Sequence, residues 1–302
     1  MPPARAAAAA CCFLLAAAGT EPALAEWALQ HEIDFRAGQP LDPAFWSLET
    51  GLLRNQESQY YTPANVRVEP GFLRIEARRE QVPNAAYRPG ATGWRNRSPV
   101  AQYTSGSLVS KPAFRYGRFE IVARSPGGAG VWPAIWLLHE SAGQYGEIDI
   151  LESVGKHPDT AFVGVHYGRE PNTRQHRNAN RQLPGFEGSW HTHSVEWTPE
   201  RITLSLDGTP VMVFDPRQAA VGGNDPLRQP MHLRINLALG GTWGGAIDDS
   251  RLPARLDIAS IRIWRWDASA AASTAPAASA TPAASAPAAV ADAPLPVPRW
   301  GR

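Results

Sequence analysis

The chain has 302 residues, 43% of them hydrophobic, and a formal net charge of +1 at pH 7. A chain of this length can bury one large core, and β-sandwiches of this size form single domains. Because its basic residues form no cluster, the sequence argues against a nucleic-acid partner held by phosphate contacts.

Residues 1–25 have the pattern of an export signal. Arg5 precedes an apolar run from Ala6 to Ala18, and residues 23–25 supply small side chains for cleavage. The run is too short to span a bilayer. Both cysteines lie in this segment, so cleavage would leave no thiol for a disulfide or for catalysis. The sequence therefore predicts a secreted or periplasmic protein with no membrane partner.

Between residues 26 and 266, short β-type runs alternate with turns rich in Gly, Pro and Asn. No long segment keeps a helical period, and no repeat of 20 to 50 residues is present. Asp207-Gly208 is a typical hairpin turn between two of the runs. This pattern indicates one antiparallel sandwich domain. The clearest runs are residues 73–78, 118–122, 202–206, 211–214, 232–237 and 258–264.

The segment VWPAIWLL, residues 131–138, carries two tryptophans. A strand here would place Trp132, Ala134 and Trp136 on one face. Two indole rings on either side of a small residue form a flat apolar surface that suits the C–H faces of a sugar ring. Core packing is the alternative, because tryptophan more often has a structural role. The sugar-binding hypothesis therefore depends on the neighbouring strand.

The segment GEIDILE, residues 146–152, carries three carboxylates. Strand alternation places Glu147 and Asp149 on one face but would direct Glu152 among the isoleucines, where an unpaired carboxylate is costly. One extra residue, a β-bulge, would return Leu151 to the core and Glu152 to the face of the other acids. The sequence therefore predicts a bulged strand with three acids on one face.

Three acids beside an aromatic surface fit glycoside hydrolysis. The retaining mechanism needs a nucleophilic carboxylate and a proton donor whose carboxyl groups are about 5 to 5.5 Å apart. A bulge and flexible side chains allow Glu147 and Glu152 to flank one bond. Asp149 between them can raise the pKa of the acid or share a proton with the nucleophile. A solvated acidic face or a calcium site is the alternative.

Residues 267–302 form a segment of Ala, Pro and Ser with hardly a charge. Such a composition cannot bury enough apolar surface to fold, so we expect a disordered tail. An anchoring role is the alternative.

Eight segments, in this order, resemble family 16 glycoside hydrolases over residues 27–266, in particular the bacterial laminarinase (endo-1,3-β-glucanase) branch. The resemblance implies an all-β jelly-roll sandwich of two antiparallel sheets, concanavalin A-like, with a cleft across the concave sheet. It also implies Glu147 as nucleophile, Glu152 as general acid/base and Asp149 as assisting acid, with no cofactor required for the chemistry. The segments are RNQESQYYTPANV, YTSGSLVS, YGRFEIVAR, GVWPAIWLL, GEIDILES, HSVEWTPERITLSLDG, RINLALGGTWGG and LDIASIRIW.

By similarity, a further set of side chains should line the cleft and bind substrate. For three of them the sequence alone also allows a structural role. His166 can be an ordinary strand histidine, Asn236 a buried residue that supports a loop, and the glycines around Trp243 part of a turn. Two positions depart from the family pattern: Val122 stands where relatives usually have arginine, and the Trp-Pro common ahead of the acids is absent. The set comprises Trp132, Trp136, Glu120, Asn55, His166, Asn236 and Trp243.

Many relatives bind a structural calcium ion on the convex side. The matching positions are Asp34 and Gly71 through backbone oxygens and Asp257 through its carboxylate. The resemblance therefore implies a structural calcium site here.

These observations lead to one main hypothesis, a secreted, monomeric, retaining endo-β-1,3-glucanase acting on laminarin-like polysaccharides. A mixed-linkage 1,3-1,4-β-glucanase or an agar or carrageenan hydrolase is the alternative within the same family. A non-catalytic glucan-binding protein is the alternative from another class, and the retained acids Glu147 and Glu152 argue against it.

Overall fold

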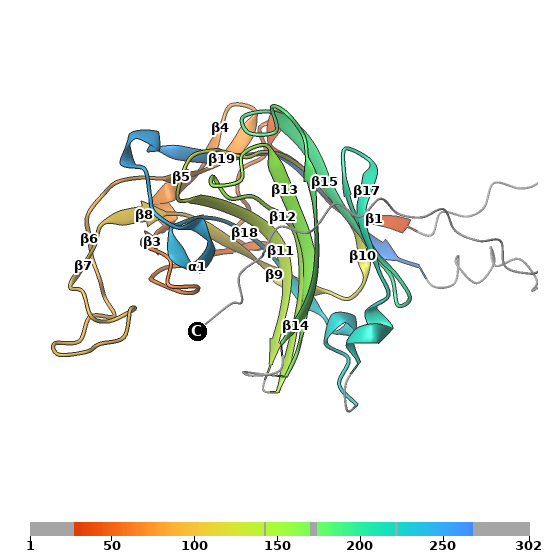
Figure 1. The fold of residues 1–302 in the computed structure, drawn as a ribbon. Helices are drawn as coiled ribbons and strands as arrows, with labels where there is room; N and C mark the ends of the chain where they lie inside the picture. Colours follow the sequence, from red (N-terminus) through yellow and green to blue (C-terminus); the bar gives the residue numbers. More distant parts are fainter. Residues whose placement is uncertain (1–26, 142, 170–173, 221–222, 268–302) are drawn as a thin grey trace, which may run out of the picture.

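A computed structural model describes residues 27–141, 143–169, 174–220 and 223–267 (Figure 1). The expected export signal, residues 1–25, lies outside the described residues, as does the expected tail apart from Asp267. In the described part of the chain, no helix is both long and apolar enough to cross a membrane.

Two large antiparallel sheets make up the fold, which confirms the predicted β-sandwich. The first sheet has seven strands in the order β14-β13-β12-β11-β18-β9-β2. These are β2 (Trp46–Leu48), β9 (Ser107–Phe114), β11 (Val131–Ser141), β12 (Gln144–Glu152), β13 (Thr160–Gly168), β14 (Gln175–Gln182) and β18 (Met231–Leu239).

The second sheet has eight strands in the order β17-β16-β15-β10-β19-β5-β4, with β1 also paired to β19. These are β1 (Trp27–Asp34), β4 (Val66–Glu69), β5 (Phe72–Ala77), β10 (Gly117–Arg124), β15 (Trp190–Trp197), β16 (Ile202–Leu206), β17 (Thr209–Phe214) and β19 (Ala254–Trp266).

Smaller elements complete the described fold. A parallel pair joins β3 (Gln59–Tyr61) to β8 (Tyr103–Ser105), and an antiparallel pair joins β6 (Val82–Pro83) to β7 (Val100–Ala101). Helical structure is limited in these residues to α1 (Gly241–Gly244) and the 3-10 turns η1 (Phe35–Ala37), η2 (Pro63–Asn65), η3 (Pro216–Ala219), η4 (Pro226–Arg228) and η5 (Asp249–Arg251).

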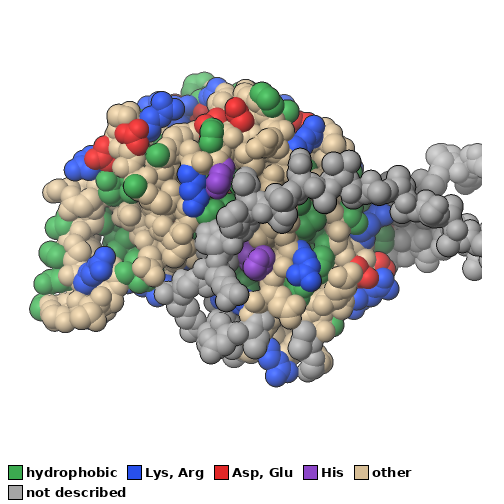
Figure 2. Space-filling view, viewed as in Figure 1, with side chains coloured by type: hydrophobic (Ala, Val, Ile, Leu, Met, Phe, Trp, Pro, Cys, Tyr) green, Lys and Arg blue, Asp and Glu red, His purple; other side chains and the backbone are tan. Residues whose placement is uncertain are grey.

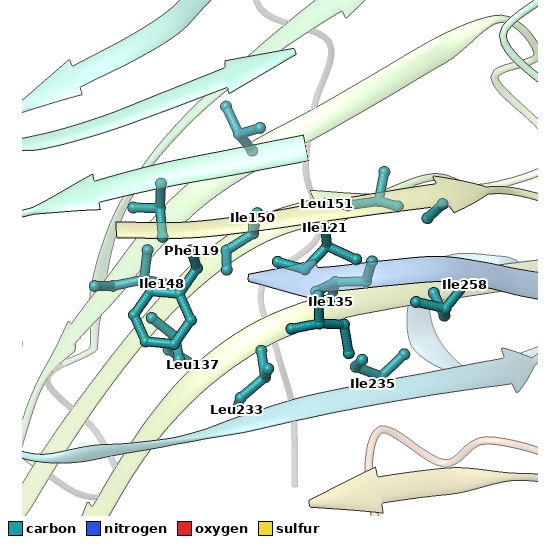
Figure 3. Packing of buried hydrophobic residues seen from close by; sticks show 14 of the residues in the cluster. Phe119, Ile121, Ile135, Leu137, Ile148, Ile150, Leu151, Leu233, Ile235 and Ile258 are labelled. Atoms are coloured by element: carbon teal, nitrogen blue, oxygen red, sulfur yellow. The ribbon is translucent and has the colours of Figure 1, made fainter. Parts of the chain in front are cut away.

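The hydrophobic core lies between the two sheets. Alternation in β10 buries Phe119, Ile121 and Ala123 and leaves the intervening side chains half-buried on the outer face. Full burial of each large apolar side chain stabilises the fold by about 1.5–3 kcal/mol. Figure 3 shows the β10 side chains beside Ile135 of β11 and Ile258 of β19, so both sheets contribute to one core.

Strand β12 contains the predicted bulge. On β11, Asp149 pairs with Trp136 and Leu151 with Ile135, so Ile150 is the extra residue without an opposite partner. Pairing with β13 shifts at the same place. The bulge lets consecutive residues Ile150 and Leu151 both enter the core, where Figure 3 shows them with Ile148. The prediction of a bulge and of a buried Leu151 is confirmed.

The hairpin between β16 and β17 also follows its sequence signal. Asp207 and Gly208 both have positive φ, 50° and 71°, as a two-residue hairpin turn requires. On the face shown in Figure 2, acidic and basic side chains are interspersed, in keeping with the near-zero net charge.

Candidate active site

A cleft of about 790 Å³ lies on the face of the seven-stranded sheet that points away from the core. Strands β11, β12 and β18 supply its floor, and the segment between β2 and β3 supplies one wall. Residues that line it are Glu49, Leu53, Arg54, Asn55, Glu57, Arg95, Trp132, Ala134, Trp136, Leu138, Ser141, Gly143, Tyr145, Glu147, Asp149, Glu152, Arg174, Arg234 and Asn236.

The bulge of β12 brings all three acids into this cleft. Glu147 pairs with Leu138 of β11, Asp149 pairs with Trp136, and Glu152 pairs with Ala134. These partners follow one another at every second residue of β11. Because of the bulge, the five residue steps from Glu147 to Glu152 on β12 cover the same length as four steps of β11, about 13 Å between the Cα atoms of the two glutamates. The two glutamate side chains must lean toward each other to flank one bond, and Asp149 lies between them.

Each acid has a defined neighbour. The Tyr145 hydroxyl donates a hydrogen bond to Glu147 Oε2, and Trp132 Nε1 donates one to Glu152 Oε1 over 3.0 Å. His166 Nε2 lies 3.4 Å from Asp149 Oδ2 and 4.0 Å from Glu147 Oε1. The two hydrogen bonds orient Glu147 and Glu152 at the cleft floor, and the imidazole packs beside Asp149.

Burial dominates the electrostatics of the acids. It raises the pKa of Glu147 to about 7 and, with the Glu147 charge nearby, raises the pKa of Glu152 to about 8. Burial and both glutamates raise the pKa of Asp149 well above its usual value. Burial lowers the pKa of His166 to about 3, so this imidazole is neutral. The pKa shifts of all three acids are upward, so the cluster keeps protons at a pH where exposed carboxyl groups have lost theirs.

Comparisons with known proteins agree with this arrangement. The chain matches the sequence profile of Glycosyl hydrolases family 16 over residues 57–252. It is 36% identical to a β-glucanase of Rhodothermus marinus over 263 residues, 80% of this chain and 86% of that protein. The chain belongs to glycosyl hydrolase family 16.

Solved structures of relatives have the same fold. The laminarinase from Rhodothermus marinus is 36% identical, with a TM-score of 0.64 over 80% of this chain and 98% of that one. A second structure comes from work on endo-acting O-glycanases that human gut bacteria express to initiate mucin breakdown. It is 30% identical, with a TM-score of 0.73 over 80% of this chain and 91% of that one. The predicted jelly-roll sandwich and family are thus confirmed.

A bell-shaped pH profile should follow from the two glutamates of this family 16 cleft. The resemblance implies Glu147 as nucleophile and Glu152 as acid. In those roles, Glu147 would lose its nucleophilicity below about pH 7, and Glu152 would lose the proton that the leaving group needs above about pH 8. We expect kcat/KM on a soluble β-glucan to be maximal between these limits. Activity that keeps rising from pH 8 to pH 10 would contradict this assignment of the acid.

The two tryptophans of β11 line the cleft, as predicted, but their rings are largely buried. Trp132 is 2% exposed and Trp136 is 8% exposed. Trp136 Nε1 donates to Asn236 Oδ1 over 2.8 Å, and the guanidinium groups of Arg54 and Arg234 lie 5.4 and 5.3 Å from its ring centroid. The indoles therefore orient polar groups of the site as well as forming its floor.

Two residues predicted to line the cleft lie elsewhere. Glu120 is on the outer face of β10 in the other sheet, paired with Arg118 over 3.1 Å and with Arg262 over 3.8 Å. Since Val122 shares that outer face, its departure from the family pattern removes no cleft contact. Trp243 is 1% exposed and packs edge-on against Trp132 at 5.5 Å, so it supports a residue of the cleft floor rather than lining the cleft.

The remaining predicted residues are near the acids or on the cleft wall. His166, on β13, is buried beside Asp149 rather than on the cleft surface. Asn55 lines the wall and donates from Nδ2 to Glu57 Oε1 over 3.1 Å. The glycine pattern before Trp243 is explained by this wall, because a Cβ on Gly241 would lie 2.8 Å from the Asn55 carbonyl oxygen.

Lining residues that the sequence analysis missed include Glu57, Tyr145 and Arg234. Tyr145 and Arg234 lie two residues before Glu147 and Asn236 on the same strand face, so period-two alternation would have found them. Glu57 accepts hydrogen bonds from the side chains of Asn55, Gln59 and Tyr61. Because Asn55 lies in a turn with a φ of 53°, strand alternation does not lead to Glu57, which required the structure.

The calcium ligand proposed at Asp257 does not fit the structure. Arg74 donates to Asp257 Oδ1 over 2.8 Å and to Oδ2 over 3.1 Å, and Arg124 donates to Oδ2 over 2.6 Å. Two guanidinium groups engage both oxygens and would repel a cation. The backbone of Asp34 pairs with that of Ser260 on β19, and Gly71 lies in the turn before β5. The expectation that Asp257 binds calcium is therefore wrong.

Chelation should consequently leave the protein's stability unchanged. We expect EDTA to shift the melting temperature by less than about 1 °C. By contrast, Asp257→Asn removes the negative charge between the guanidinium groups of Arg74 and Arg124. This substitution should destabilise the fold by about 3 kcal/mol. Asp34→Asn, which removes a more exposed pair with Arg36, is the matched control and should cost under about 1 kcal/mol. A melting temperature that falls in EDTA and recovers with Ca²⁺ would show that the protein does bind a structural calcium ion.

The ligand atoms of Glu147, Asp149 and His166 lie within 4.8 Å of one another. Two of these residues, Glu147 and Asp149, are acids for which the family resemblance implies a catalytic role. Hydrolysis by two carboxyl groups and water requires no cofactor.

Proposed function

We propose that this protein is an endo-acting β-glucanase that hydrolyses 1,3-β-D-glucosidic bonds in laminarin-like polysaccharides. One observation carries the proposal: Glu147, Asp149 and Glu152 share the floor of an open cleft in a family 16 chain. A cleft open to solvent admits the interior of a polymer. The relative from Rhodothermus marinus is named a β-glucanase and a laminarinase.

In the proposed mechanism, Glu147 attacks the anomeric carbon while Glu152 protonates the departing glycosidic oxygen. Glu152, now ionised, then removes a proton from water, which hydrolyses the glycosyl–enzyme ester and releases Glu147. Asp149, whose pKa is raised by burial and by both glutamates, lies beside the nucleophile and can share a proton with the Glu147 carboxylate. Two displacements retain the β configuration. Trp132 orients Glu152 through its indole N–H in both steps.

A second candidate function is the hydrolysis of a different glycan, such as a galactan or a mucin O-glycan. The higher TM-score, 0.73, to the structure from the O-glycanase work favours it. Mixed-linkage 1,3-1,4-β-glucan is a further candidate substrate. Carboxyl chemistry is the same in each case, so only the wall residues of the cleft distinguish them.

Digestion of a polysaccharide panel tests the substrate. Laminarin, curdlan, lichenan, agarose, carrageenan and mucin would be incubated with the enzyme and the products sized. We expect laminarin to give a ladder of short oligosaccharides early in the reaction, as endo-cleavage produces. Release of products from agarose, carrageenan or mucin but not from laminarin would replace the proposal with the second candidate.

We also propose that the chain is exported and acts as a monomer. The support for export is the pattern of residues 1–25, which lie outside the described part of the structure. N-terminal sequencing of the protein recovered from outside the cytoplasm should begin at Glu26. Light scattering during gel filtration should give the mass of one chain.

A further inference from the structure

Tyr145 makes a contact that the mechanism above does not use. It lies two residues before Glu147 on β12, so both side chains project from the same strand face. Its hydroxyl donates a hydrogen bond to Glu147 Oε2. The tyrosine is 8% exposed and lines the cleft next to the acid. The contact therefore fixes one oxygen of the proposed nucleophile from the side opposite to Asp149 along the strand.

The tyrosine ring is held on more than one side. The guanidinium carbon of Arg174 lies 3.5 Å from the ring centroid, a stacking distance at which the cation is attracted to the π face. Tyr145 also belongs to one apolar cluster with side chains of β11, namely Ala134, Trp136 and Leu138. The stack on Arg174 and this cluster restrict the ring, so packing helps to set the direction of its hydroxyl.

We propose that Tyr145 is a positioning residue that holds Oε2 of Glu147, so that Oε1 is the oxygen that attacks the anomeric carbon. The proposal rests on the proposed role of Glu147 as nucleophile. His166 Nε2 lies 4.0 Å from Oε1, beyond hydrogen-bond distance, so this imidazole does not compete with the substrate for Oε1.

The covalent step then proceeds with a defined role for each oxygen. An electron pair of Oε1 forms the bond to the anomeric carbon as the bond to the leaving oxygen breaks, and that oxygen takes the proton of Glu152. Oε2 becomes the carbonyl oxygen of the ester and remains a good acceptor, whereas the bridging Oε1 becomes a poor one. The Tyr145 hydrogen bond therefore persists from the free enzyme through the intermediate.

The charged and titratable groups around Glu147 determine what removing the hydroxyl should do. Tyr145, Arg174, Arg234 and Arg54 each favour the ionised carboxylate, in that order, against the larger effect of burial. Burial and the Glu147 charge hold the pKa of Tyr145 well above 10, so the hydroxyl stays a donor. The other groups facing the nucleophile are Asp149 and Glu152 of β12 and His166 of β13.

Tyr145→Phe is the direct test, since it removes the hydroxyl and keeps the stacked ring. A hydrogen bond to a charged group is worth about a 10- to 100-fold change, so kcat should fall by that factor while KM changes less than about twofold. The acidic limb of the kcat/KM profile should move to higher pH, because Glu147 loses a donor that stabilises its ionised form. Kinetics would be measured on laminarin, or on whichever panel polysaccharide the wild-type protein hydrolyses.

Tyr103→Phe is the matched control. The Tyr103 hydroxyl donates to Asp249 Oδ1 over 2.8 Å, also a tyrosine–carboxylate contact, but neither residue lines the cleft. This variant should keep the wild-type kcat and pH profile. If Tyr145→Phe has the same kcat and the same pH profile as Tyr103→Phe, the positioning role of Tyr145 is wrong, whether or not the enzyme is a glucanase. A wild-type protein that cleaves no laminarin but another glycan overturns only the proposed substrate.

Arg174→Met provides an independent test, because it removes both the cation that stacks on the Tyr145 ring and a positive charge near Glu147. Loss of the guanidinium should lower kcat and move the acidic limb to higher pH in the same direction as Tyr145→Phe. In the double variant, the two losses should be less than multiplicative, because both act on one carboxylate. Fully multiplicative losses would show that the two side chains act independently, and would overturn the inference that the Arg174 stack helps Tyr145 to hold Glu147.

Discussion

Glu147→Gln should abolish hydrolysis of laminarin, with kcat reduced by at least about 10³-fold, as expected when a nucleophile is removed. The amide keeps the size of the side chain and can accept the Tyr145 hydrogen bond, but it cannot displace the leaving oxygen. The product-release assay would be run with enough enzyme to detect the residual rate.

Folding and glucan binding should survive this substitution. Burial raises the pKa of Glu147 from 4.5 to about 7, so ionising it costs stability as the pH rises through that range. Glutamine carries no such cost, and the melting temperature of the variant at pH 8 should equal or exceed that of the wild type. Affinity electrophoresis in laminarin should show unchanged retardation. Glu120→Gln, on the outer sheet, is the control and should keep full activity.

Glu152→Gln should reduce laminarin hydrolysis by about 10²- to 10⁴-fold, the usual contribution of a general acid or base. A substrate with a dinitrophenyl leaving group needs no protonation, so the first displacement should be largely spared. The second should become limiting, because no base activates water. Burst kinetics would separate the two displacements.

Azide offers a sharper measurement on the Glu152 variant. As a nucleophile that needs no base, azide should restore turnover and give a β-glycosyl azide, since two inversions have occurred. Glu147→Gln treated in the same way should give no β-azide. An α-azide from Glu147→Gln is compatible with loss of the nucleophile, whereas an α-azide from Glu152→Gln would show that the two roles are exchanged.

The bulge in β12 shows how far the sequence alone can lead. Burying a carboxylate is costly, and this cost alone required the alternation to break between Asp149 and Glu152, as the register shows. Strand assignments around Trp132 and Asn236 followed from the same period-two pattern. Local alternation, turn residues and the cost of burying charge therefore predicted the acids and the strands beside them.

Glu120 was assigned to the cleft by family resemblance, and strand alternation could not have corrected this assignment. Alternation separates the two faces of β10 but does not say which sheet the strand joins, and that choice places Glu120 on the outside of the molecule. Asp257 is similar, because its arginines come from β5 and β10, which flank β19 only once the sheet order is known. Contacts between residues distant in sequence, including Arg174 with Tyr145, required the structure.

Trapping the glycosyl–enzyme intermediate tests the central claim most directly. A 2-deoxy-2-fluoro-β-laminaribiosyl fluoride should form the ester but hydrolyse it slowly, and peptide mass spectrometry should locate the added sugar. We predict the label on Glu147, within the β12 peptide, and none in the Glu147→Gln variant. A label on Glu152 or on another carboxylate, or an unlabelled enzyme whose first laminarin product is the α-anomer, would contradict the account.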